Sequence, residues 1–333
     1  MTGKDGGITS PPIDWLLDSG LPWVRAWTLR DLLGRPPDDP DLRAARQATA
    51  DHPAVRGLIA DLVAWPGEAL KRHNDAGHGL HKLALLADLG LTLDDPGLEA
   101  IAGRVLAGQA PEGPFTVNLL IHERYGGDGQ AHPAWMACDA PTVLYALLAF
   151  GLADDPRVGR ALDHLLGLVA TDGWHCVVAK ALGDFRGPGR RDDPCPYATL
   201  IALRALSQVP DLRESEAARQ GIETLLWHWS VQRERKLYLF GIGTDFRKPK
   251  YPLVWYDLLH VVDVLGYFPA ARRDPRFQAM LGELMLQADE DGRFTARSMY
   301  KAWKGWDFAD KKTPSPTITA AAWRAFQRAQ EAA

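Results

Sequence analysis

Cysteine is scarce in this sequence, with three residues among 333. The three lie far apart, and so small and odd a number argues against a disulfide scaffold and favours a reducing, cytoplasmic location. No run of about 18 apolar residues occurs, which excludes a membrane-spanning helix and therefore integral membrane contact. The first segment, "MTGKDGGITSPP", lacks the apolar stretch of a secretory signal, and we expect residues 1–12 to form a flexible tail.

A strong net charge of either sign is also missing. The formal charge of −4 at pH 7 gives no electrostatic reason to expect nucleic acid or an anionic membrane surface as a partner. The hydrophobic content of 46% is ample for a buried core. The partner that we expect is a small-molecule substrate.

Six apolar segments share a start signal and recur at similar intervals. Successive starts are separated by 57, 62, 55, 56 and 64 residues. Five of the six begin with proline and one begins with glycine in the same frame, the starts being Pro22, Gly79, Pro141, Pro196, Pro252 and Pro316. Proline suits the first position of a helix, because the N–H that it lacks would have no partner there. The pattern therefore predicts a repeated helix.

A second helix follows four of these segments. Each opens with aspartate before proline, in "DDPDLRAARQA", "DDPGLEAIAGRVL", "DDPRVGRALDHLL" and "RDPRFQAMLGELM". Aspartate caps a helix and proline fits its first turn. The second helices are amphipathic, whereas the first ones are nearly apolar all round, which predicts an outer and an inner set. Strand-forming runs are few, and "KLYLFGIG" is the best candidate for a small hairpin.

We therefore predict an all-α fold, with residues 13–333 as a single domain. About six inner and five outer helices, in hairpin repeats of 55–64 residues, would close into an (α/α) ring that buries the inner helices on both sides.

Three short motifs add a family resemblance. "QAPEGPF" and "QADEDGRF" look like degenerate forms of a Q-x-x-x-G-x-W motif, and "TDGWHC" keeps its Gly-Trp pair. With the helical hairpins, these residues resemble the α/α-toroid superfamily of squalene–hopene cyclases, protein prenyltransferase β subunits and lanthipeptide cyclases. The resemblance implies a central, cavity-type active site. No specific member is matched, because the D-x-D-D acid of the cyclases and the Asp-x-Cys zinc pair of the prenyltransferases are both absent.

The cysteines stand near helix starts. Cys138 and Cys195 lie at or just before two inner helices, and Cys176 follows the turn between them. In a ring these starts face the same end, where a helix N-terminus favours a thiolate and zinc binds Cys and His. We predict a zinc site from Cys138, Cys176 and Cys195, with His175 or His260 as the fourth ligand. Three thiols with an open position would suit activation of a thiol or water. The alternatives are three packed cysteines or one reactive thiol.

A second candidate site lies in "YPLVWYDLLHVVDVLG". Asp257 and His260 are three residues apart on one face of the helix predicted from Pro252, with Tyr256 beside them. Polar groups buried in an apolar helix need partners. We expect Asp257, His260 and Tyr256 to serve in proton transfer, and the alternative is an Asp–His contact that joins two inner helices.

Two loops that precede inner helices combine basic and aromatic residues, "GTDFRKPKYP" and "RSMYKAWKGWDFADKKTPSPT". We predict a cationic, aromatic rim that binds an anionic substrate. Its candidate residues are Arg247, Lys250, Tyr300, Lys301, Trp303, Lys304 and Trp306. The alternative is a pair of loops whose lysines face water.

These patterns favour an enzyme with a central active site, assisted by zinc, that acts on a small or isoprenoid-like anionic molecule. A cyclase, a transferase or a lyase would fit. One alternative is a non-catalytic helical-repeat scaffold that binds a partner at the mouth of the ring. Another is a six-hairpin sugar epimerase or hydrolase, which needs two carboxylates across the cavity. Asp245 and Asp257 are the only obvious pair for that chemistry.

Overall fold

Helices dominate the structure, as the sequence predicts. The structure is a computed structural model, and it describes residues 10–331 except 184, 186, 188 and 191. Most of the predicted tail, residues 1–12, lies outside this range. In the described part of the chain, no helix is both long and apolar enough to cross a membrane.

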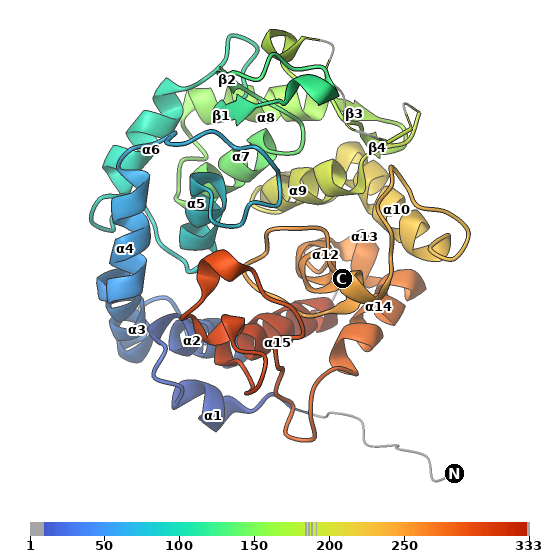
Figure 1. The fold of residues 1–333 in the computed structure, drawn as a ribbon. Helices are drawn as coiled ribbons and strands as arrows, with labels where there is room; N and C mark the ends of the chain where they lie inside the picture. Colours follow the sequence, from blue (N-terminus) through green and yellow to red (C-terminus); the bar gives the residue numbers. More distant parts are fainter. Residues whose placement is uncertain (1–9, 184, 186, 188, 191, 332–333) are drawn as a thin grey trace.

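The inner helices surround a common centre (Figure 1). Neighbours along the chain pack together from α5 through α7, α9 and α12 to α15, and α15 returns to α2. Every residue of α9 is buried, which is why its sequence is apolar all round. The inner helices are α2 (Pro22–Trp27), α5 (Gly79–Asp88), α7 (Ala140–Ala149), α9 (Pro196–Leu206), α12 (Leu258–Leu265) and α15 (Pro316–Gln330).

The amphipathic helices lie outside this set (Figure 1). Six occur in the described residues, one more than predicted, because the chain before α5 folds as two helices joined at His52. They are α3 (Pro40–Asp51), α4 (Pro53–Leu62), α6 (Leu98–Ala107), α8 (Pro156–Gly167), α10 (Glu216–Ser230) and α14 (Pro275–Met285). Short helices complete the fold: α1 (Ile13–Leu17), α11 (Thr244–Arg247) and α13 (Pro269–Arg272), with a π-helical turn over Thr28–Leu32 after α2.

Aspartate caps begin three of the outer helices as predicted. The carboxylates of Asp39, Asp155 and Asp274 accept hydrogen bonds from backbone N–H groups in the first turns of α3, α8 and α14. The fourth pattern is different, because Asp95 accepts from the backbone of Thr92 at 2.7 Å instead. That helix, α6, begins two residues later than expected.

Short strands occur where the sequence did not predict them. β1 (Val117–Leu120) and β2 (Ala131–Ala134) form an antiparallel hairpin, and β3 (Val169–Ala170) pairs with β4 (Gly173–Trp174). In "KLYLFGIG" the structure has a minimal hairpin turn, in which a single antiparallel bridge joins Leu237 to Phe240. Tyr238 and Leu239 between them have left-handed φ angles of 47° and 67°, as a two-residue hairpin turn requires, but the pairing extends no further into strands.

The helix predicted from Pro252 begins only at Leu258. Asp257 caps it, with a carboxylate oxygen 3.1 Å from the backbone nitrogen of His260. The prediction that Asp257 and His260 share a helix face is therefore wrong, because Asp257 precedes the helix.

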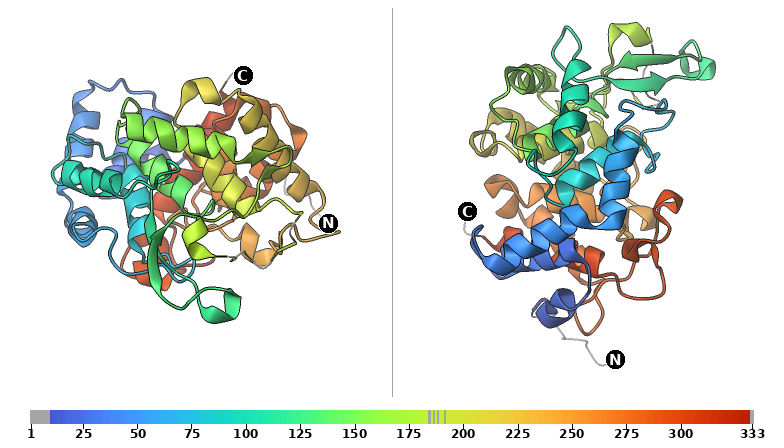
Figure 2. Two further views of the ribbon diagram at one scale, coloured as in Figure 1. Left: turned by 90° about the horizontal axis from the view of Figure 1, so that it is seen from above. Right: turned by 90° about the vertical axis from the view of Figure 1, so that its left-hand side faces the viewer.

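Residues 251–256, the crossing segment, form neither helix nor strand and are hydrogen-bonded to the inner helix α9. The Tyr197 hydroxyl donates to the carbonyl of Val254 at 2.9 Å, and the Arg204 guanidinium donates to that of Leu253 at 3.1 Å. The two ends of the inner helices face opposite sides of the molecule (Figure 2). On one side lie the N-terminal ends of the inner helices, with the loop before α5, the β1–β2 hairpin and the loop before α15 (Figure 2, right). The C-terminal ends lie on the other.

Candidate metal centre

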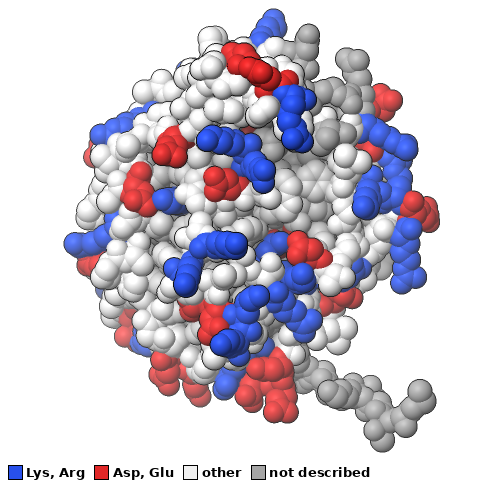
Figure 3. Space-filling model, viewed as in Figure 1, with Lys and Arg blue, Asp and Glu red and all other residues white. Residues whose placement is uncertain are grey.

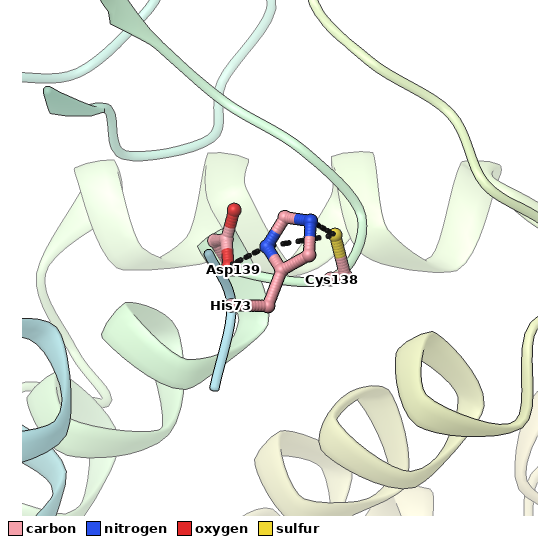
Figure 4. A group of neighbouring side chains, drawn as sticks. All are labelled: His73, Cys138 and Asp139. Carbon is pink, nitrogen blue, oxygen red and sulfur yellow. Dashed lines mark hydrogen bonds and ion pairs between the residues drawn. The ribbon is translucent and has the colours of Figure 1, made fainter. Parts of the chain in front are cut away.

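Three side chains from two loops meet at the N-terminal side of the ring (Figure 4). His73 comes from the loop before α5, and Cys138 and Asp139 stand where α7 begins. The Nδ1 atom of His73 is 2.8 Å from Oδ1 of Asp139, and its Nε2 atom is 3.4 Å from the Cys138 sulfur. The possible ligand atoms of the three residues lie within 4.8 Å of one another. No other group of three His, Cys, Asp or Glu side chains in the described part of the chain is as close.

The loop that carries His73 is held from several sides. His81 contacts the carbonyl of His73 itself at 2.7 Å through Nε2, and His78 contacts the carbonyl of Glu68 at 2.9 Å. The indole N–H of Trp303 donates to the carbonyl of Ala76 at 2.9 Å. The backbone of the loop that carries His73 is therefore held in place.

Asp139 is an unusual buried carboxylate. Its side chain is 0% exposed, and Oδ2 has no hydrogen-bond partner in the described part of the protein. Nor does Asp139 cap α7, the role that its position next to the helix would suggest. A buried, unpaired carboxylate oxygen costs several kcal/mol. A cation at this point would remove that cost.

The protonation of the group follows from its surroundings. Burial lowers the pKa of His73, but the charge and hydrogen bond of Asp139 outweigh this and raise it above the ordinary value. Burial raises the pKa of the Cys138 thiol well above its ordinary value, and the charge of Asp139 adds to the effect. Cys138 is therefore a neutral thiol at neutral pH.

The cysteine–histidine contact is not arranged for proton transfer. The Cys138 sulfur lies 3.5 Å from Nδ1 and 3.4 Å from Nε2 of His73. Since a ring carbon separates the two nitrogens, a sulfur equally distant from both within the ring plane would overlap that carbon. The sulfur therefore lies over the face of the imidazole, where neither nitrogen lone pair points. Asp139 accepts from Nδ1, which leaves Nε2 as the free nitrogen of a carboxylate–histidine pair.

The four ligands predicted from the sequence do not form one site. Only Cys138 belongs to the group; Cys195 caps α9, Cys176 accepts from the backbone of Gly187 at 3.4 Å, and Nε2 of His175 is 2.7 Å from Asp172. The three sulfurs are nevertheless near one another, since negative charge on Cys176 or Cys195 would raise the pKa of Cys138.

The lowered thiol pKa expected at a helix start is also wrong for Cys195. Its sulfur accepts from the backbone N–H of Ala198 in the first turn of α9, at 3.5 Å. Burial outweighs this interaction and raises the pKa of Cys195 to about 12.

His73 and Asp139 were missed by the sequence analysis. The run "KRHNDAGHGLH" places three histidines in nine residues directly before or within an inner helix. Asp139 sits beside Cys138, two residues before the proline that marks α7. Both signals resemble ordinary loop and cap patterns, so only the spatial contact distinguishes them.

A second group of buried polar atoms surrounds Asp257, one of the predicted catalytic residues. The carboxylate is 0% exposed, and Oδ2 has no hydrogen-bond partner among the described residues. The Lys250 ammonium lies 4.0 Å from this oxygen and 3.7 Å from Asp245. Burial raises the pKa of Asp257 to about 7, against the opposing charge of Lys250. The buried hydroxyl of Tyr300 also lacks a partner in the described structure.

The other two predicted catalytic residues make core contacts. The Tyr256 hydroxyl is 2.9 Å from Nδ1 of His228, and Nδ1 of His260 is 2.9 Å from the carbonyl of Trp255. Burial lowers the pKa of His260 well below its ordinary value, so its ring is neutral. Neither contact is the Asp–His contact between two inner helices that was the alternative, because Asp257 meets only the backbone nitrogen of His260.

Two tyrosines connect the metal group with Asp257. Burial raises the pKa of Tyr197, and the charges of Asp139 and Cys138 raise it further. Burial likewise raises the pKa of Tyr300, followed by the charges of Asp257 and Tyr197. Tyr197 is therefore close enough to feel the charge of Asp139, and Tyr300 close enough to feel that of Asp257.

The residues of the predicted rim divide into two kinds. The Arg247 guanidinium is held by Glu283 at 3.1 Å and by Gln232, and Trp303 and Trp306 pack in an aromatic cluster with Phe308. Lys301 and Lys304 are exposed, while Lys250 is buried. Figure 3 shows basic side chains around the middle of this face, with acidic ones among them. The structure thus leaves Lys301 and Lys304 of the predicted rim accessible, but not Lys250.

Comparison with known proteins gives no identity for this chain. No protein-family model matches the sequence, and no curated protein is similar to it. A crystal structure of a protein from Actinoplanes aligns with 92% of this chain and 90% of that chain, at 18% identity and a TM-score of 0.41. A likeness this slight indicates neither fold family nor function.

Proposed function

We propose that this chain is an α/α-toroid enzyme whose central site holds a metal ion, zinc being the best fit, through His73, Cys138 and Asp139. Its substrate would be a small anionic molecule. The observation that carries the proposal is the buried, unpartnered oxygen of Asp139 beside an imidazole and a thiol. The order of the inner helices around a common centre supports the toroid.

Zinc suits this donor set better than other common metals. It accepts sulfur, nitrogen and oxygen ligands together in tetrahedral sites, whereas calcium and magnesium prefer oxygen alone. Three protein ligands leave one position for water or substrate, as in catalytic sites. When bound there, zinc would supply a lowered pKa for a coordinated water or thiol. The alternative of a cysteine nucleophile with a histidine base is less suitable, because it leaves the second oxygen of Asp139 buried without a partner.

Asp257 supplies the second element of the site. A carboxyl group with a pKa of about 7 can both accept and donate a proton near neutrality. The Lys250 ammonium beside it would attract the anionic group of a substrate, and the N-terminal ends of the inner helices add partial positive charge.

The sugar epimerase or hydrolase is less well supported. Asp245 and Asp257 lie 3.7 Å and 4.0 Å from the same lysine nitrogen. Two carboxylates that share one ammonium do not face each other across a substrate.

Metal analysis of protein purified without chelator tests the proposal. We expect about one zinc per chain, and its loss in His73→Ala and Asp139→Asn. His73 is 29% exposed, so its removal should leave the fold intact. His175→Ala is the matched control, because His175 pairs with Asp172 elsewhere. Protein without metal, or His73→Ala with undiminished metal, would contradict the proposal.

A scaffold with a purely structural metal is the remaining alternative. With cobalt in place of zinc, an added small thiol such as 2-mercaptoethanol should change the visible spectrum if a position is open to ligands. A spectrum that does not respond to the thiol would favour a closed, structural site.

A further inference from the structure

A cavity lies at the C-terminal ends of the inner helices. It has a volume of about 640 Å³, within the range of small-molecule sites. Its walls include Asp88, Ala149, Asp263 and Arg328, which lie at or near the C-terminal ends of α5, α7, α12 and α15. Tyr251 from the crossing segment also lines it. The metal group lies at the opposite ends of these helices, so the two sites are separate.

Guanidinium groups are fixed around this cavity. The Arg324 guanidinium lies 4.4 Å above the Trp27 ring and pairs with Asp31. The Arg328 guanidinium lies 4.0 Å above the Tyr267 ring and pairs with Asp263. Stacking on one side and an ion pair on the other hold each planar group in a single orientation. Little side-chain entropy would be lost when a ligand binds to them.

Some of the hydrogen-bond donors around the cavity have no acceptor among the described residues. Both oxygens of Asp31 are engaged, one by Arg30 at 2.6 Å and the other shared by Arg30 and Arg324. The Nε atom of Arg328 is buried without a partner among the described residues. Arg46 also lines the cavity, is exposed, and forms no ion pair in the described part of the chain. A ligand rich in acceptor oxygens would satisfy these donors.

The helix ends limit the charge of that ligand. C-terminal ends carry partial negative charge, which opposes an anion. Arg328 donates to the main-chain carbonyl of Asp263 near the end of α12, at 3.2 Å, and so offsets part of it. A ligand with one anionic group is therefore favoured over a polyanion.

We propose that this cavity is a second ligand site, which binds a small polar molecule through one carboxylate or phosphate group held by Arg46, Arg324 and Arg328. Guanidinium groups recognise both oxyanions by paired hydrogen bonds. The rest of the cavity, with the phenol rings of Tyr251 and Tyr267 in its wall, would hold a polar remainder. This site does not depend on the proposed metal function.

Thermal unfolding in inorganic phosphate and in acetate, at constant ionic strength against chloride, tests the proposal. Binding to the folded state predicts a saturable rise in Tm with at least one of the two probes. The probe that acts identifies the group as phosphate or carboxylate. If neither phosphate nor acetate raises Tm, the proposal is overturned.

Variants separate a bound anion from the general stabilising effect of phosphate. Arg46→Gln should weaken binding about tenfold, the loss of about one charge-assisted hydrogen bond. Arg43→Gln on the same helix, outside the cavity, should bind as the native protein does. Arg324→Gln should abolish binding, and Arg46→Gln keeps the test valid if that variant does not fold. Equal effects in Arg46→Gln and Arg43→Gln would overturn the proposal. The same measurements on His73→Ala should match the native protein, whatever its metal content.

Discussion

The substitution Asp257→Asn should make the protein more stable at alkaline pH. The ordinary pKa of this side chain is 3.8, and burial raises it to about 7 in the folded protein. Between pH 4 and 7 the folded protein therefore keeps a proton that the unfolded chain releases. Unfolding free energy falls as pH rises through this window, because the folded state must then bury a charge.

The magnitude follows from the two pKa values. A difference between 3.8 and about 7 corresponds to about 4 kcal/mol once the carboxyl is fully ionised. Asparagine removes this penalty, and it still caps α12 as aspartate does. Lys250 keeps Asp245 as a partner at 3.7 Å in the variant. As pH rises from 4 to 8, the free energy of unfolding of the variant should increase by about 4 kcal/mol relative to that of the native protein.

Urea denaturation of both proteins across this range measures the difference. Asp245→Asn is the control, because the Asp245 pKa is lowered by Lys250 despite partial burial, and its effect has the opposite sign. If the difference in unfolding free energy between the native and Asp257→Asn proteins stays constant from pH 4 to 8, the burial argument is refuted. If Asp257 transfers protons, the more stable variant should also be the inactive one.

Three further substitutions test how the core is held. Arg204→Ala leaves the buried Asp88 carboxylate without its ion-pair partner, and should lower the free energy of unfolding by about 3–5 kcal/mol in urea denaturation; a loss below 1 kcal/mol would contradict this. Trp303→Phe removes one hydrogen bond to the loop before α5, and should cost about 1 kcal/mol in stability and weaken metal retention. Tyr256→Phe should cost about 1–3 kcal/mol, because it leaves the buried Nδ1 of His228 unpaired, and metal analysis should find the native metal content.

The sequence predicted the helical organisation well, because its signals are local. Proline at the first turn and aspartate before it act through neighbouring backbone groups, and they mark α9 and α8 correctly. The same signals failed at Pro252. There the Asp257 carboxylate five residues later caps the helix instead, and the chain between them forms neither helix nor strand.

The candidate site could be predicted only in part. Cys138 was found because a thiol beside a helix start is rare in this chain. His73 is 65 residues away from it, and no local pattern joins the two. The local sequence also did not reveal how deeply each side chain is buried, because burial depends on the whole fold. Burial raises the thiol pKa of Cys195, whereas the helix start alone would lower it.

The direct test of the metal centre is the absorption spectrum of the cobalt-substituted protein. A cysteine ligand produces an intense sulfur-to-cobalt charge-transfer band in the near ultraviolet. We expect this band in the native protein and in Cys176→Ser and Cys195→Ser, and its loss in Cys138→Ser. A native spectrum without the band, or a band that survives Cys138→Ser, would contradict the account.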